Sequence, residues 1–248
     1  MKVKSILVSQ PAPVGDSSPY FDIEKKHKIK IDFFPFIHVQ GADTKDVRLQ
    51  KIDFSNFTAI IFTSKNAIDH FFRLSEEMRF IVPDSMKYVC QSEAIALYLQ
   101  RYIVYRKRKI YFGEKEADDM IPHLKKNPDE KYLLPTSDVL NQDIPDALDK
   151  AKIDWTRAIL FRTVSSDVAS KIENIYKYDT LVFFSPSGIK SLFDNYASFK
   201  QKKINIGTFG HSTKQAAEEA GLTVNFFAPT KEKPSMTKAL DDFLQQLS

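Results

Sequence analysis

The chain has 248 residues and a mass of 28.5 kDa, enough for one large or two small domains at roughly 100–200 residues per domain. Its residues are 43% hydrophobic and 27% charged, which excludes a disordered tail, a collagen and a coiled coil. No run of about 18 apolar residues occurs, so we expect no transmembrane helix. We interpret the short apolar start as a buried strand, not a signal peptide. The single cysteine, Cys90, cannot form an intramolecular disulfide, and we expect a cytoplasmic protein.

The charge balance favours an anionic ligand. The formal net charge is +4, without the concentrated basic patch of a dedicated nucleic-acid-binding protein, so we expect no nucleic-acid partner. We interpret the basic run Arg101–Lys109 as an edge strand protected by charge. The chain has only seven glycines, and neither GxGxxG nor GxxxxGK[ST] is present, so the two common phosphate-binding loops are absent.

Short apolar runs alternate with amphipathic helical patterns along the whole chain. This alternation predicts an α/β fold with largely parallel sheets. The expected strands are 4–8, 29–34, 57–63, 86–90, 108–112, 131–135, 155–161, 179–184, 203–209 and 223–227.

The two halves of the chain resemble each other. The segment 57–72, an apolar strand ending at Ser64 and followed by a helix, aligns with 178–193, where Ser185 stands at the strand end. Residues 88–92 then align with 208–212, and residues 6–9 with 133–136. Three matches in the same order indicate a duplication into two similar α/β lobes with a cleft between them.

Hydroxyl-bearing residues follow many of the expected strands. Ligands of open parallel sheets bind at the carboxyl ends of the strands, where helix N-termini offer N–H groups to anions. Each such serine or threonine could instead serve only as a helix cap. Taken together, we interpret the set as an anion-binding surface, formed by residues 64–66, 91–92, 113–115, 136–137, 185–188 and 210–213.

No catalytic constellation is evident. The five histidines are scattered, no HExxH or GxSxG motif occurs, and we expect no metal site. We interpret Cys90 as a buried, inert thiol, and the acidic pairs 118–119 and 218–219 as solvated charges. His211 precedes Ser212 at an expected strand-to-helix turn; it either contacts an anion or acts as an acid, or is a plain surface histidine.

The second half resembles uroporphyrinogen-III synthases. Three segments carry the resemblance. They are Asp179-Thr-Leu-Val-Phe-Phe-Ser-Pro-Ser-Gly-Ile, then Ile206-Gly-Thr-Phe-Gly-His-Ser-Thr with its Ala-rich helix and Gly221-Leu, and then Ala228-Pro-Thr. Phe62-Thr-Ser-Lys-Asn-Ala looks like the equivalent motif of the other lobe, and Phe161-Arg-Thr looks like the Tyr-Arg-Thr crossover segment. The resemblance covers the whole chain in order and spacing.

The sequence departs from the family pattern at three places. Ser9-Gln10-Pro11 replaces Thr-Arg-Pro, Phe161 occupies the position of a tyrosine that is a candidate catalytic group, and Cys90-Gln-Ser-Glu replaces a Gly-x-x-Thr turn. The second departure puts tyrosine-dependent proton transfer in doubt.

The resemblance implies two α/β lobes, each a parallel sheet flanked by helices, joined by two crossing linkers. One lobe would contain 1–36 plus 165–248, the other 38–162, and the linkers would be Phe34–Val39 and Leu160–Val164. The implied partner is hydroxymethylbilane, a linear tetrapyrrole octa-carboxylate, closed to uroporphyrinogen III with inversion of ring D. No cofactor is implied, and because the duplication supplies both lobes we expect a monomer.

The resemblance also implies which residues meet the substrate. N–H groups would bind its carboxylates, Lys65 and Arg162 would be charge partners, and His211 is our hypothesis for an acid. The expected substrate-binding residues are Ser64, Lys65, Asn66, Arg162, Ser185, Ser187, Gly188, Ser212 and Thr213.

Three other functions stay open. A non-catalytic cytosolic two-lobed protein could bind a carboxylated small molecule in the same way. A family member that has lost activity would fit Phe161 and Gln10. A phosphosugar or nucleotide enzyme is disfavoured by the missing glycine loops.

Overall fold

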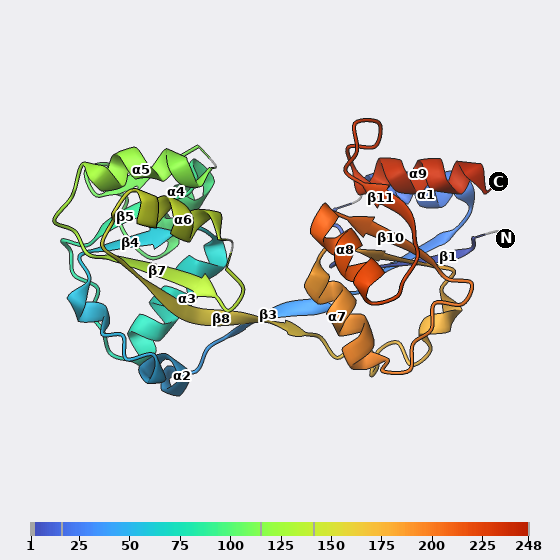
Figure 1. The fold of residues 1–248 in the computed structure, drawn as a ribbon, viewed down its shortest axis with the longest axis horizontal. Coiled ribbons are helices and arrows are strands. Elements are labelled where there is room, and N and C mark those ends of the chain that lie inside the picture. Colours follow the sequence, from blue (N-terminus) through green and yellow to red (C-terminus); the bar gives the residue numbers. More distant parts are fainter. Residues whose placement is uncertain (1–2, 16, 115, 141, 248) are drawn as a thin grey trace. The chain divides into compact units, whose positions relative to one another are not determined.

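A computed structural model describes residues 3–15, 17–114, 116–140 and 142–247. The chain divides into two compact units, one of Met1–His38 and Val164–Ser248, the other of Val39–Thr163. It therefore passes from one unit to the other twice, once within strand β3 (Ile37–Gly41) and once within strand β8 (Trp155–Ser165), as labelled in Figure 1.

The first unit is built on a five-stranded parallel sheet in the order β11-β10-β9-β1-β2. Its strands are β1 (Ser5–Val8), β2 (Lys30–Phe33), β9 (Thr180–Phe183), β10 (Asn205–Phe209) and β11 (Val224–Ala228). Its helices are α1 (Pro19–His27), η3 (Ile175–Lys177), α7 (Pro186–Asn195), α8 (His211–Glu219) and α9 (Met236–Gln246).

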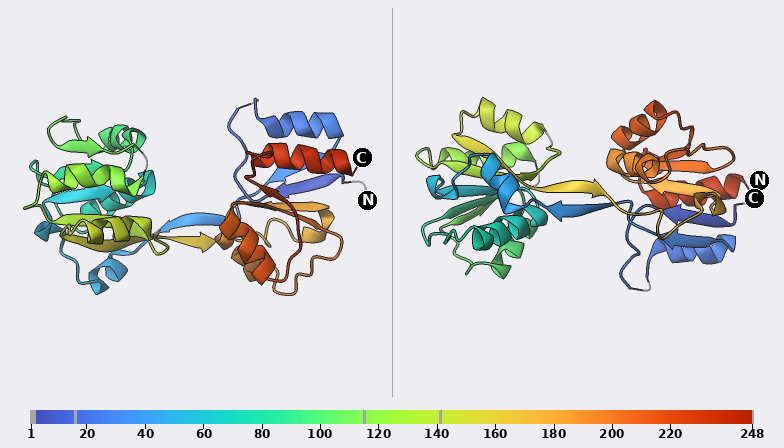
Figure 2. Two further views of the ribbon diagram at one scale, coloured as in Figure 1. Left: turned by 45° about the horizontal axis from the view of Figure 1, so that its top comes forward. Right: turned by 90° about the horizontal axis from the view of Figure 1, so that it is seen from below.

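Helices cover both faces of this sheet (Figure 2). Ile6 and Val8 of β1 pack with α1 and α9, whereas Leu7 between them packs with α7 and α8. Because neighbouring strand residues point to opposite faces, a sheet buried on both faces needs a continuous apolar run. This explains the strand sequence Ser-Ile-Leu-Val.

The second unit has a six-stranded sheet in the order β3-β8-β7-β4-β5-β6, with parallel pairing from β8 to β6. Besides β3 and β8, its strands are β4 (Ala59–Phe62), β5 (Lys87–Cys90), β6 (Ile110–Phe112) and β7 (Tyr132–Ser137). Helices α2 (Thr44–Leu49), α3 (Lys65–Glu77) and α4 (Glu93–Tyr98) pack on one face, and α5 (Ala117–Lys125) and α6 (Asp143–Lys150) on the other. Two single-turn helices are η1 (Phe54–Asn56) and η2 (Leu99–Arg101).

The two sheets have matching strand orders, β11-β10-β9-β1-β2 and β6-β5-β4-β7-β8. The strands paired in the sequence repeat occupy equivalent positions: β9 with β4, β10 with β5, and β1 with β7. Each sheet takes strands from both halves of the chain. The predicted fold class, α/β with parallel-dominated sheets flanked by helices, is confirmed.

The segments predicted as linkers are largely strand. Ile37–Gly41 forms β3, and Leu160–Val164 lies inside the longer β8, with which β3 is hydrogen-bonded. Pairing satisfies the backbone N–H and C=O groups that an extended linker would leave without partners. Among the described residues, no helix is long and apolar enough to cross a membrane.

Candidate functional site

In the first unit, the carboxyl ends of all five parallel strands lie at one edge of the sheet. Helix α7 starts there with Ser185 as its N-cap, and the Ser185 hydroxyl accepts from the Gly188 N–H at 3.1 Å. Residue 186 is a proline and has no N–H. Of the predicted contacts on α7, Ser187 therefore keeps its N–H for a ligand, whereas that of Gly188 is already bonded within the cap.

Helix α8 starts differently. Its N-cap is Gly210, held at φ +89, a conformation that favours glycine, and glycine offers no side-chain acceptor. The N–H groups of His211, Ser212 and Thr213 therefore have no capping side chain. Uncapped N–H groups together with the helix dipole attract anions, so the start of α8 is suited to binding one.

His211 and Ser212 are exposed, whereas Thr213 is 1% exposed and packed beneath the first turn. The His211 ring lies against Phe227 of β11, with centroids 4.9 Å apart, and the Lys214 ammonium lies 5.4 Å from the same ring. An exposed imidazole and a nearby ammonium thus flank the uncapped start of α8.

In the second unit, helix α3 starts at the carboxyl end of β4. Ser64 is its N-cap and accepts from the Ala67 N–H at 3.1 Å. Lys65 and Asn66, the first two helical residues, are exposed. The Lys65 ammonium lies 5.2 Å from the centre of the Tyr98 ring. The structure thus brings Ser64, Lys65 and Asn66 together at one helix terminus.

Arg162, an expected charge partner, lies on β8 with its side chain half-exposed. Its guanidinium forms an ion pair with Asp46 of α2, at 3.2 Å, so its charge is already balanced within the unit. Phe161, one residue earlier, is 6% exposed and part of the core under α3. A bulge in the β7–β8 pairing at Ser137 turns Phe161 toward that core.

His70 on α3 contacts Phe161 and was missed by sequence reasoning. The two rings stack with centroids 5.2 Å apart. Arg73 donates to His70 Nδ1 at 3.4 Å, so the neutral ring carries its proton on Nε2. Burial, reinforced by the Arg73 charge and opposed by Asp69, lowers the pKa of His70. The i, i+3 spacing of His70 and Arg73 was readable, but their contact with β8 was not.

Arg157 of β8 was also missed. Its guanidinium donates to Thr136 Oγ1 at 3.0 Å and to the carbonyl oxygens of Ser137 and Asp138 at 2.8 Å. These contacts hold a cation at the carboxyl end of β7, and no carboxylate of a described residue forms an ion pair with it. Arg157 is therefore a second guanidinium suited to an anion there.

No group of three or more His, Cys, Asp or Glu side chains suited to a metal occurs among the described residues. Burial raises the pKa of the Cys90 thiol to about 12, which leaves it protonated and unreactive at neutral pH. The groups at both sheet edges are therefore suited to binding an anion, through N–H groups, hydroxyls and single cations.

Comparison with known proteins points to one family. The family model described as "Uroporphyrinogen-III synthase HemD" matches residues 23–238. A search of curated protein sequences gives no match.

Two solved structures share the fold. The uroporphyrinogen-III synthetase of Helicobacter pylori is 18% identical with a TM-score of 0.61, and covers 98% of this chain and 99% of its own. A mutant uroporphyrinogen III synthase of Thermus thermophilus is 12% identical with a TM-score of 0.53, over the same shares. The match of the family model over most of the sequence carries the assignment: the chain belongs to the uroporphyrinogen-III synthase family.

Proposed function

We propose that this chain catalyses the closure of hydroxymethylbilane to uroporphyrinogen III, with inversion of ring D. The single observation that carries the proposal is the match of the family model over residues 23–238. The helix termini and cations at the two sheet edges support it, because they suit a substrate rich in carboxylates.

The reaction asks for positioning more than for a reactive side chain. The substrate loses a hydroxyl group to give an electron-rich azafulvene cation, which closes without inversion when unaided. The protein must hold the flexible chain so that the substituted carbon of ring D attacks and a spiro intermediate forms. Such control of orientation is worth several orders of magnitude in rate and needs no nucleophile.

We assign the strongest carboxylate contact to the start of α8. Its three N–H groups have no capping side chain, because Gly210 precedes them. Further carboxylate contacts come from the Ser187 N–H on α7. In the second unit they come from Lys65, Asn66 and Arg157. Ser64 and Ser185 act chiefly by fixing the helix starts, because their hydroxyls already accept from N–H groups.

His211 is our assignment for the proton donor that assists departure of the hydroxyl group. It is exposed and is the first residue of α8, beside the proposed carboxylate contact. Phe161 cannot donate a proton, and its buried ring supports the sheet instead.

A coupled isomer assay tests the proposal. Hydroxymethylbilane is generated in situ by its synthase, this protein is added, and the oxidised uroporphyrins are separated by chromatography. We expect the type III isomer to dominate, whereas folded protein that yields only type I would reject catalysis.

Two observations favour a second candidate, a binding protein for a carboxylated tetrapyrrole. Phe161 lacks the hydroxyl of the resembling proteins, and Arg162 is paired with Asp46. Tight binding of the substrate with only type I product would establish that function. Light scattering at assay concentration checks the further proposal that the protein is a monomer.

A further inference from the structure

A cavity of about 400 Å³ lies in the second unit, away from the carboxyl ends of its strands. Its wall includes the loop 82–86 that leads into β5 and the loop 103–109 that leads into β6. It therefore lies toward the amino ends of these strands, on the side of the sheet that α3 covers. Small-molecule sites typically measure about 300–1,000 Å³.

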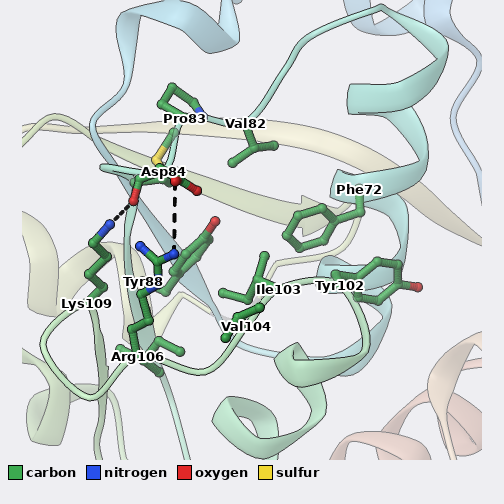
Figure 3. A pocket seen from close by; sticks show the side chains of 12 residues that line it. Phe72, Val82, Pro83, Asp84, Tyr88, Tyr102, Ile103, Val104, Arg106 and Lys109 are labelled. Atoms are coloured by element: carbon green, nitrogen blue, oxygen red, sulfur yellow. Dashed lines mark hydrogen bonds and ion pairs between the residues drawn. The ribbon is translucent and has the colours of Figure 1, made fainter.

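The cavity is polarised, as Figure 3 shows: charged side chains gather on one side and aromatic ones on the other. On the apolar side, the rings of Phe72 and Tyr102 stack in parallel, with centroids 4.6 Å apart. The Tyr102 hydroxyl donates to Asp69 at 2.6 Å, which fixes this wall. A wall that is already ordered costs little entropy when a ligand binds.

The charged side carries a net positive charge. Arg106 lies 4.0 Å from the Asp84 carboxylate, and the Lys109 ammonium donates to the Asp84 backbone carbonyl. Only Arg106 is near the Asp84 carboxylate, which is 96% exposed, and the Lys109 ammonium is held by a neutral carbonyl. Lys107 and Arg108 lie between them in the sequence and add to the positive field without lining the cavity.

Tyr88 lies between the two sides, with its hydroxyl pointing into the cavity (Figure 3). That hydroxyl has no hydrogen-bond partner among the described residues. Burial raises the pKa of Tyr88, reinforced by Asp84 and Cys90, so the hydroxyl stays protonated and can donate to an acceptor.

We propose that this cavity binds a small amphipathic organic anion, whose aromatic or other apolar body packs against Phe72 and Tyr102 while its carboxylate or sulfonate meets Arg106 and Lys109. The basic run 101–109 was predicted as an edge strand, which is wrong: Arg101 ends η2, 102–109 form a loop, and the edge strand β6 begins only at Ile110. The proposed site gives this basic loop a role. It is separate from the proposed tetrapyrrole site and does not depend on the proposed function.

The test is a fluorescence titration with 8-anilinonaphthalene-1-sulfonate, an aromatic sulfonate, and with the neutral N-phenyl-1-naphthylamine. We expect one saturable sulfonate site in the wild-type protein. The double variant Arg106→Gln/Lys109→Gln should bind the sulfonate about tenfold more weakly, since charge-assisted contacts are lost. Its affinity for the neutral probe should stay unchanged.

The matched control is Lys107→Gln/Arg108→Gln, which removes the same charge from the same loop but not from the cavity wall. It should bind the sulfonate like the wild type. A second variant, Val104→Glu, places a carboxylate at the cavity wall on an exposed loop position and should also weaken sulfonate binding.

Three results would overturn the proposal. The first is the absence of a saturable sulfonate site in the wild type. The second is equal weakening in both double variants, which would reduce the effect to the general charge of the loop. The third is an equal loss of affinity for the neutral probe in Arg106→Gln/Lys109→Gln, which would show that the two cations do not recognise the anion. None of these results bears on isomer formation, so this proposal and the proposed function fail separately.

Discussion

The imidazole of His70 stacks on the ring of Phe161, with centroids 5.2 Å apart and planes inclined by 23°. The contact joins α3 to β8 next to the point where β8 leaves the second unit. Phe161 thus packs against a titratable side chain, and two expectations depend on that contact.

We expect Phe161→Leu to lower the free energy of unfolding by about 1 kcal/mol, since an apolar side chain of similar volume replaces the ring in the core. The rate of type III isomer formation should change little, because the buried ring carries no transferable proton. Urea unfolding and the isomer assay measure the two effects. A large loss of type III product at unchanged stability would instead place the ring in contact with substrate.

His70 should make the second unit sensitive to acid. Because burial and Arg73 lower its folded-state pKa, the unfolded chain, with a histidine pKa near 6.5, takes up the proton more readily. Its contribution is present above about pH 6.5 and is lost as the pH falls toward the folded-state pKa. Urea unfolding from pH 7.5 to 5 should show a smaller decline in His70→Gln than in the wild type. The exposed His38, substituted likewise, is the control; identical slopes in all three proteins would contradict the expectation.

Substituting His211 tests the proton donor. General acids contribute about 100-fold or more, so His211→Ala should slow type III formation by at least that order while the fold stays intact. Lys214→Gln, which removes the ammonium beside Phe227, should weaken substrate binding more than turnover. An unchanged product profile in His211→Ala would end the assignment.

The serine caps separate folding from binding. Ser185→Ala should lower the free energy of unfolding by about 1 kcal/mol through loss of the bond to Gly188. Asn174→Ala removes a comparable cap bond, to the Tyr176 N–H at 3.0 Å, at the amino end of β9. Both variants should lose similar stability, but only Ser185→Ala should raise KM. Equal KM values would confine Ser185 to its capping role.

Gly207 in β10 should tolerate no side chain. A Cβ there would lie 2.2 Å from the Phe226 ring, which in turn stacks on Phe243 of α9 at 4.6 Å. We expect Gly207→Ala to cost about 1–3 kcal/mol and Phe226→Leu to recover part of it in the double variant. Gly188→Ala, where the nearest atom is at 3.5 Å, is the control and should be near neutral in urea unfolding. Additive effects of Gly207→Ala and Phe226→Leu would contradict this packing account.

Local patterns in the sequence were sufficient for much of the fold. Short apolar runs and Ser or Gly at the strand ends predicted ten of the eleven strands in the described part of the chain and the starts of α3, α7 and α8, because these features depend on neighbours within a few residues. The eleventh strand, β3, was read as linker. Its sequence, Ile-His-Val-Gln-Gly, has only partly buried or exposed positions, so its pairing with β8 leaves little apolar signal.

The sequence by itself determined the α/β class, the duplication and the helix starts, since each follows from the spacing of apolar and capping residues along the chain. Only the tertiary structure decided which cations are available. Arg162 pairs with Asp46, far away in sequence, while Arg157 donates to carbonyl oxygens and has no carboxylate partner among the residues that the structure describes. It likewise decided that Tyr102 and Lys109 line one cavity. Charge pairing and cavities arise from contacts between distant segments, and no local pattern encodes them.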